Sequence, residues 1–86
     1  MDIEATIVSL LRQRSPESSI CPSEVARALA SDEAEWRTLM QPVRHAAAVL
    51  ARQGKLSITQ GERQVDPRDI DHGAIRLRRG QAFPEE

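Results

Sequence analysis

Hydrophobic residues at the start of the chain follow the 3.6-residue repeat of an amphipathic helix, and the pattern stops at Ser15-Pro16. The apolar positions with this spacing are Ile3, Ile7, Leu10 and Leu11. A stub of strand over 19–21 follows. Pro22 suits the first position of a second helix, over 22–30, because its missing N–H has no intrahelical partner there.

The middle of the chain predicts two further helices separated by a proline. Asp32 is suited to cap a helix over 33–40, because Glu35 follows three residues later in a capping-box arrangement. The helical repeat continues to Leu50, but Pro42 lacks an N–H and clashes with the turn before it. We therefore expect a kink or tight turn and then a helix over 42–53, ended by Gly54 in the left-handed conformation.

After Gly54 the hydrophobic period changes from helix to strand. Leu56 and Ile58 alternate with polar residues, and Ile75 and Leu77 do the same further along. A turn over 61–63 and an irregular loop over 64–73 separate the two predicted strands. Because the loop and the tail over 81–86 have few apolar residues, we expect both to be flexible.

The predicted core collects the apolar positions of these elements. Trp36 is assigned to this core, with a partner-facing hot spot as the alternative. The core residues are Ile7, Leu10, Leu11, Val25, Leu29, Trp36, Leu39, Val43, Leu50, Leu56, Ile58, Ile75 and Leu77.

The order of elements is that of a winged helix-turn-helix. The predicted fold is α+β, with three to four helices and a small antiparallel β-hairpin as the wing, in one domain over 1–80 followed by a flexible tail over 81–86. The sequence motifs PSEVARAL, LSITQ and IRLRR, together with the segment from Trp36 to Arg44, resemble those of a small bacterial family of uncharacterised function. The resemblance covers about residues 3–80. It implies a winged-helix fold and a bacterial cytoplasmic setting, and it implies no established activity.

Composition excludes several classes of protein. The 86 residues carry 12 basic and 13 acidic side chains, so the chain is not a simple polycation. No apolar stretch reaches the roughly 18 residues of a membrane span. A lone cysteine, Cys21, fits a reducing cytoplasm. The sequence has no Ser-His-Asp arrangement, Gly-rich phosphate loop or supported carboxylate pair, so we expect neither enzymatic activity nor a cofactor.

The near-neutral net charge of the chain hides an uneven distribution of charge along the sequence. Residues 1–35 hold seven acids and three bases, residues 36–63 hold five bases and one acid, and residues 64–86 hold four bases and five acids. The basic segment includes the helix predicted over 42–53. On a helical wheel, one face of this helix is polar or small, opposite the stripe from Val43 to Leu50. That face comprises Gln41, Arg44, His45, Ala48 and Arg52.

These residue types contact phosphates and purine edges in the major groove of DNA. The leading hypothesis is therefore a transcription-regulator-like module that binds duplex DNA, and we expect the acids of residues 1–35 to lie on its far side. The alternative is a protein-interaction or scaffold domain without nucleic-acid binding. The candidate residues are Gln41, Arg44, His45 and Arg52 on the helix, with Lys55 and Arg63 touching phosphate from the wing.

Three further features admit two interpretations each. Arg76 and Arg78 share one face of the last predicted strand. They either hold phosphates or form ion pairs with the aspartates of the preceding loop, which are Asp66, Asp69 and Asp71. The ion pairs are favoured because these aspartates are near the arginines in the sequence.

The aspartates and histidine of this loop are residue types that bind metal ions, but they do not have the spacing of a known metal-binding loop, so we expect no metal site. Cys21 is interpreted as a small buried hydrophobe, with a redox sensor as the weaker alternative.

Overall fold

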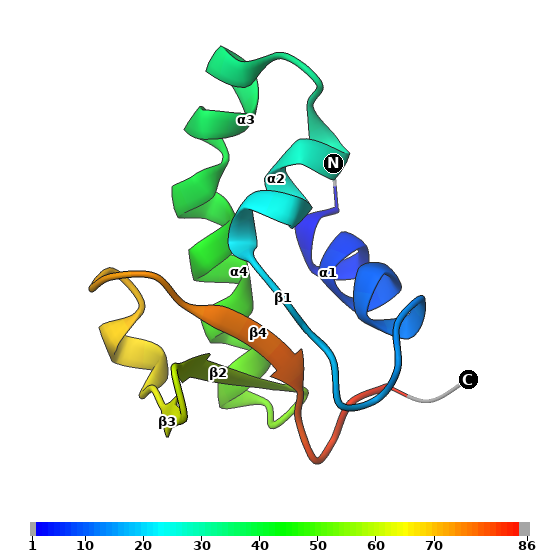
Figure 1. Ribbon diagram of the computed structural model, residues 1–86, viewed down its shortest axis with the longest axis vertical. Coiled ribbons are helices and arrows are strands. Elements are labelled where there is room, and N and C mark those ends of the chain that lie inside the picture. The colour runs from blue at the N-terminus through cyan, green and yellow to red at the C-terminus, as the bar shows by residue number, and fades with distance from the viewer. Residues whose placement is uncertain (1, 85–86) are drawn as a thin grey trace.

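The computed structural model describes residues 2–84, in which four helices and four short strands form an α+β fold (Figure 1). The predicted class is confirmed, and the arrangement is compatible with a winged helix. The elements are α1 (Ile3–Arg12), β1 (Ser19–Ile20), α2 (Pro22–Leu29), α3 (Glu33–Thr38), α4 (Met40–Arg52), β2 (Leu56–Gln60), β3 (Arg63–Gln64), the 3-10 turn η1 (Pro67–Asp69) and β4 (Arg76–Arg79).

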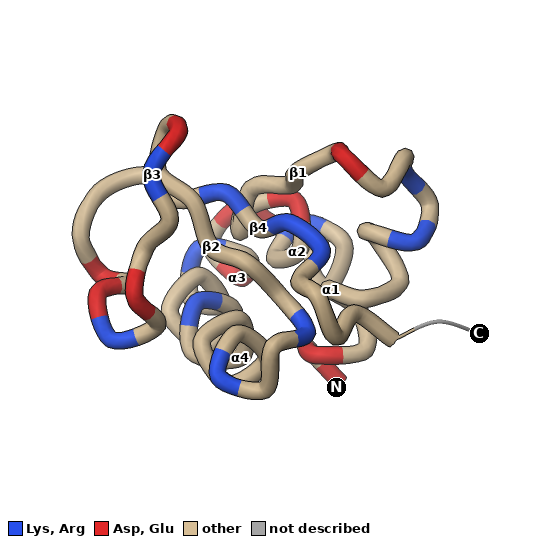
Figure 2. The backbone as a smooth tube through the Cα atoms, turned by 90° about the horizontal axis from the view of Figure 1, so that it is seen from below, with Lys and Arg blue, Asp and Glu red and all other residues tan. Residues whose placement is uncertain are grey.

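The four strands form one antiparallel sheet in the order β1-β4-β2-β3. Leu77 of β4 lies opposite Ile20 on one side and Ile58 on the other, and all three side chains are buried. Because side chains directly opposite each other point to the same face, this face is the inner one. The helices cover it, and α4 lies below the sheet in Figure 2.

A proline joint connects α3 to α4. Leu39 ends the first helix and precedes the second, so α4 begins at Met40, two residues earlier than predicted. Pro42 is the third residue of α4, where an N–H has no intrahelical partner and its loss costs nothing. A continuous helix is blocked, because the proline ring would meet the carbonyl of Thr38 four residues before it. At the other end of α3, Asp32 caps the helix by accepting from the N–H of Glu35.

The buried core contains nine of the thirteen predicted residues. The other four are half-buried because they lie toward the periphery, near α3, or on the flank of α1; α3 itself has no buried residue. Trp36 packs against the core, and the guanidinium of Arg27 lies 4.6 Å from its ring centre. The four half-buried residues are Leu10, Leu29, Trp36 and Leu39.

Apolar residues in the predicted loop over 64–73 and in the predicted tail over 81–86 are also buried. Val65 and Ile70 in the predicted loop are only 8% and 5% exposed, and Phe83 in the predicted tail is 6% exposed. The N–H of Val65 donates to the carbonyl of Ile58 over 2.8 Å, which extends the pairing of β2 and β3. Both segments are therefore anchored to the core. Their flexibility stays a prediction, and residues 85–86 of the tail lie outside the described residues.

Arg79 ties the end of β4 to the end of α1. Its side chain lies on the inner side of the sheet, opposite Leu56, and is half-buried. The guanidinium donates to the carbonyls of Leu11 and Arg14, each over 3.1 Å, and lies 4.7 Å from the ring centre of Phe83. One cation thus binds two carbonyls at and just beyond the C-terminal end of α1, where helix carbonyls carry partial negative charge.

Candidate functional site

The predicted face of α4 is only partly open to solvent. Gln41, His45 and Arg52 are exposed, as the helical wheel predicts. Ala48 is 3% exposed, however, and Arg44 is half-buried. The prediction that these two are open to solvent is wrong, because η1 and the loop after it fold back over this side of α4.

Side chains of α4 hold that loop in place. The guanidinium of Arg44 donates to the carbonyl of Ile70 and, over 3.1 Å, to that of Gly73. The amide of Gln41 donates to the carboxylate of Asp71 over 2.6 Å and lies 3.0 Å from the ring nitrogen Nε2 of His45. Three of the four helix residues predicted to bind DNA, Gln41, Arg44 and His45, therefore have hydrogen-bond partners within the chain.

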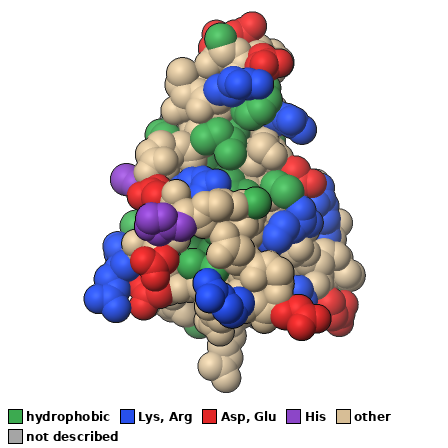
Figure 3. Space-filling model, turned by 60° about the vertical axis from the view of Figure 1, so that its left-hand side comes forward, with side chains coloured by type: hydrophobic (Ala, Val, Ile, Leu, Met, Phe, Trp, Pro, Cys, Tyr) green, Lys and Arg blue, Asp and Glu red, His purple; other side chains and the backbone are tan. Residues whose placement is uncertain are grey.

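Acidic residues flank the exposed side of α4. Asp71 lies on the η1 side, and on the other side Asp2 and Glu4 line a surface hollow together with Ala46 of α4. The expectation that the acids of residues 1–35 lie on the far side is therefore wrong for these two. In Figure 3, the side of the molecule that carries η1 shows acidic, basic and histidine side chains intermixed, not one basic patch. Carboxylates at these positions repel phosphate.

Lys55 and Arg63 lie apart from the α4 residues. Lys55 is half-buried in a hollow that it shares with Asp2 and Glu4 beside α1. Arg63 is exposed on β3, at the edge of the sheet. The six predicted residues are thus divided between three places on the surface.

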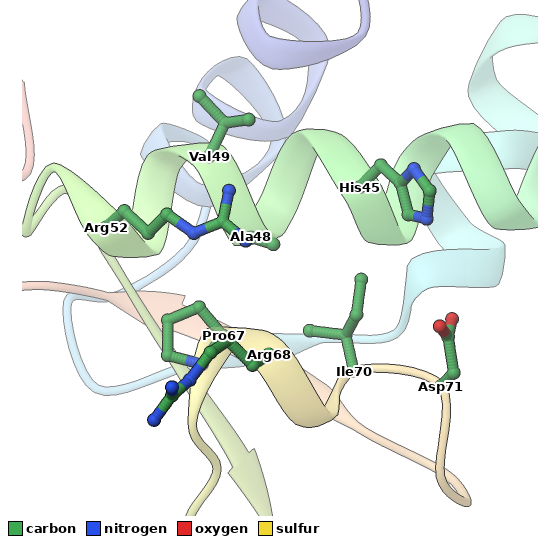
Figure 4. Close-up of a pocket in the computed structure, with 8 residues that line it drawn as sticks. All are labelled: His45, Ala48, Val49, Arg52, Pro67, Arg68, Ile70 and Asp71. Carbon is green, nitrogen blue, oxygen red and sulfur yellow. The ribbon is translucent and has the colours of Figure 1, made fainter.

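The folded-back loop creates a groove of about 350 Å³ between α4 and η1 (Figure 4). The walls are His45, Ala48, Val49 and Arg52 from the helix and Pro67, Arg68, Ile70 and Asp71 from the loop. Val49 is 37% exposed, the highest exposure of a large hydrophobic residue in the described part of the chain. We term this site the α4–η1 groove.

Arg68, which lines the loop side of this groove, forms a salt bridge with Asp66. Asp66 caps η1 by accepting from the backbone N–H of Arg68 over 2.8 Å, and the side chain of Arg68 lies 3.2 Å from the same carboxylate oxygen. These hydrogen bonds lower the pKa of Asp66 from its ordinary value of 3.8, and the charge of Arg52 acts in the same direction.

We expect the Asp66 carboxyl to titrate below 3.8 in an NMR pH titration of the folded chain. Arg68→Gln is expected to return this pKa toward its ordinary value, because the substitution removes the largest cause of the shift. A lowered pKa means that the contact stabilises the fold above pH 3.8 and that this contribution is lost as the pH falls through the folded-state pKa. An unchanged titration in Arg68→Gln would contradict the assignment.

The arginines on the outer face of β4 do not pair with the loop aspartates, so that prediction is wrong. Arg76 donates to the hydroxyl of Ser19 over 2.9 Å and to its carbonyl over 3.0 Å, and it also contacts the sulfur of Cys21. Arg78 donates to the carbonyl of Glu17 over 2.7 Å. Both side chains are exposed, and within residues 2–84 neither forms a salt bridge with a carboxylate.

The neighbours of these arginines on the outer face are uncharged hydrogen-bonding groups. Ser19 and Ser57 lie opposite Arg78, while Thr59 lies opposite both Arg76 and Gln64. Figure 2 shows basic positions along β4, with α4 on the opposite side of the sheet. We term this surface the sheet patch. It comprises Ser19, Ser57, Thr59, Gln64, Arg76 and Arg78.

The alternation of strand β4 contained the signal for the sheet patch. Ile75 and Leu77 face inward, so Arg76 and Arg78 must face outward next to the serine and threonine of β2. The sequence could not show where the loop aspartates lie. Asp71 lies beside α4, whereas Asp66 and Asp69 line a hollow beside β3, so none of the three forms a salt bridge with Arg76 or Arg78.

Two other features bear on ligand chemistry. In the described part of the chain, no three His, Cys, Asp or Glu side chains gather closely enough to hold a metal ion. Cys21 is half-buried and precedes α2, where its backbone N–H donates to the carboxylate of Glu24 over 3.0 Å. Across residues 2–84, no helix is both long and apolar enough to cross a membrane.

The fold and its surfaces define a small α+β domain compatible with the winged-helix class. The chain belongs to the family described as "Protein of unknown function (DUF3253)", whose family model matches residues 1–80. Comparison with curated proteins finds no match.

Proposed function

We propose that this chain is a non-enzymatic module that binds the phosphate backbone of duplex DNA through its sheet patch. The observation that supports the proposal is the pair of exposed arginines on β4, which have no carboxylate partner among the described residues. All other members of the sheet patch carry a hydroxyl or an amide. A surface that combines uncompensated cations with neutral donors favours a polyanion.

The spacing of the two arginines suits repeated anionic groups along one strand of nucleic acid. Arg76 and Arg78 are two residues apart on β4, so their Cα atoms are separated by about 7 Å along the strand. The serine and threonine hydroxyls and the Gln64 amide are groups that contact phosphate oxygens and sugars. Contacts of this kind position a protein on DNA without reading its sequence.

The exposed side of α4 is a poorer surface for DNA than the sequence predicts. Arg44 and Gln41 hold the loop after η1, and Asp2, Glu4 and Asp71 flank the helix. Entry into a major groove would bring these carboxylates close to phosphates. The DNA hypothesis is therefore kept, but the proposed contact surface moves from α4 to the sheet patch.

The test is fluorescence anisotropy with a labelled 20-base-pair duplex over a series of salt concentrations. The variant pair Arg76→Gln and Arg78→Gln is expected to weaken binding and to reduce the slope of log K against log salt by about two units, since each lost phosphate contact removes about 0.9. The matched control combines Arg37→Gln and Arg52→Gln, which removes the same charge from exposed helix positions. This control is expected to keep most of the wild-type slope.

Two results would overturn the proposal. If the wild-type chain binds no duplex at about 50 mM salt, where electrostatic binding is strong, the chain is not a DNA-binding module. If the helix control loses as much slope as the sheet variant, the sheet patch is not the contact surface.

A further inference from the structure

The α4–η1 groove has an apolar middle between two polar ends (Figure 4). Ala48 and Ile70 form the buried part of the middle, and Val49 and Pro67 form its open edges. Apolar side chains that meet in a concave site, with a few polar groups at the rim, are typical of binding sites.

Hydrogen bonds hold the groove in its open shape. Arg44 binds two carbonyls of the loop, and Gln41 binds Asp71 from the helix side. From the sheet side, the amide of Gln60 donates to the carbonyls of His72, over 2.7 Å, and Ala74. The loop is thus fastened to both α4 and β2. A preformed site loses little conformational entropy when it binds a ligand.

The two ends of the groove differ in charge. Arg52 and Arg68 lie at one end, and His45 and Asp71 lie at the other (Figure 4). The side chain of Arg52 makes no hydrogen bond or salt bridge with a described residue, although its charge is close enough to lower the pKa of Asp66. Arg52 therefore has donors available for an external carboxylate.

The length of the groove indicates the size of the occupant. His45 and Arg52 are seven residues apart on α4, which corresponds to about 10 Å along the helix axis. An extended peptide covers that distance with about three residues. Because residues two apart in an extended chain point to the same side, two side chains of such a segment would face the groove.

We infer that the α4–η1 groove binds a short extended segment of a partner protein that carries an acidic residue two positions from an aliphatic one. The carboxylate binds Arg52, and the aliphatic side chain packs against Ala48 and Ile70, with Val49 at the open edge. Charge complementarity with Arg52 and the apolar middle of the groove together select this occupant. The groove lies on α4, away from the sheet patch, so the inference goes beyond the proposed DNA binding and does not depend on it.

The test is an NMR titration of the isotope-labelled full chain with the hexapeptide acetyl-Ser-Glu-Ser-Leu-Ser-Gly-amide. Saturable shifts are expected at the amides of α4 and η1. The same peptide with Lys in place of Glu is expected to bind about tenfold more weakly, because a charged hydrogen bond is worth about that factor. Arg52→Gln should weaken the Glu peptide by a similar factor, and the matched control Arg37→Gln should leave its affinity unchanged.

A second variant tests the apolar part of the groove. Val49→Glu introduces a charge at an exposed position, so the chain is expected to fold and to lose peptide binding; Val49→Ala provides a milder change if the charge disturbs α4. The inference is overturned if the Glu peptide gives no saturable shifts, if the Lys peptide binds equally well, or if both Val49 variants bind like wild type. None of these results depends on DNA.

Discussion

Leu50→Ala is expected to lower the free energy of unfolding by about 2–4 kcal/mol. Leu50 is 3% exposed and belongs to the side of α4 that faces the core, together with Val43 and Ala47. The substitution removes buried apolar surface and leaves a cavity that the surrounding helices and sheet fill only in part. In an 86-residue domain this is a large share of the total stability.

Urea unfolding followed by circular dichroism measures this effect, and the neighbouring residue gives the control. Val49→Ala removes apolar atoms from the same helix one position earlier, but Val49 is 37% exposed. Its midpoint should stay close to that of the wild type. Equal losses in the two variants would mean that the core-facing side of α4 is assigned incorrectly.

Arg79→Met is expected to cost about 1.5–3 kcal/mol, the contribution typical of hydrogen bonds from a charged group. Methionine keeps apolar contact with Phe83 but cannot donate to the carbonyls of Leu11 and Arg14. The substitution therefore releases the segment that leads from α1 to β1 while leaving the sheet pairing of β4 intact.

Hydrogen exchange distinguishes this effect from a general loss of stability. In Arg79→Met, amides of residues 11–18 should exchange faster than those of β2, because the lost hydrogen bonds act on the end of α1. Arg63→Met provides the matched control, since the side chain of Arg63 is exposed and makes no hydrogen bond or salt bridge with another described residue. If Arg79→Met and Arg63→Met unfold at the same urea concentration, the tie between β4 and α1 has no energetic role.

Most elements of the fold could be predicted because the periodicity of their apolar residues is strong. The helices around Ile7, Val25 and Val43 and the strands around Ile58 and Leu77 were found where expected. Periodicity does not identify isolated apolar residues in polar segments as core residues. Val65, Ile70 and Phe83 have no periodic partner nearby in the sequence, and only tertiary packing shows that they are buried.

The candidate site was less predictable than the fold, because a helical wheel gives the direction of a side chain but not what covers it. Arg44 has the polar direction that the wheel predicts, yet the carbonyls of Ile70 and Gly73 occupy its guanidinium. The net charge of a sequence segment has the same weakness, because it does not show where the charged side chains lie in the fold. Asp2 belongs to the acidic segment of residues 1–35 and nevertheless lies beside α4, and Arg76 lies outside the segment with the largest positive charge.

The proline joint between α3 and α4 bears on whether one chain folds on itself or exchanges parts with a second copy. If residues 33–52 formed a single helix, it would be about 30 Å long and would carry the segment before it away from its own α4. That segment would then have to pack on the α4 of another molecule, which is domain swapping through an opened hinge. Pro42 forbids this straight form through a clash with the carbonyl of Thr38. A single imino acid therefore keeps the first half of the fold paired with its own second half.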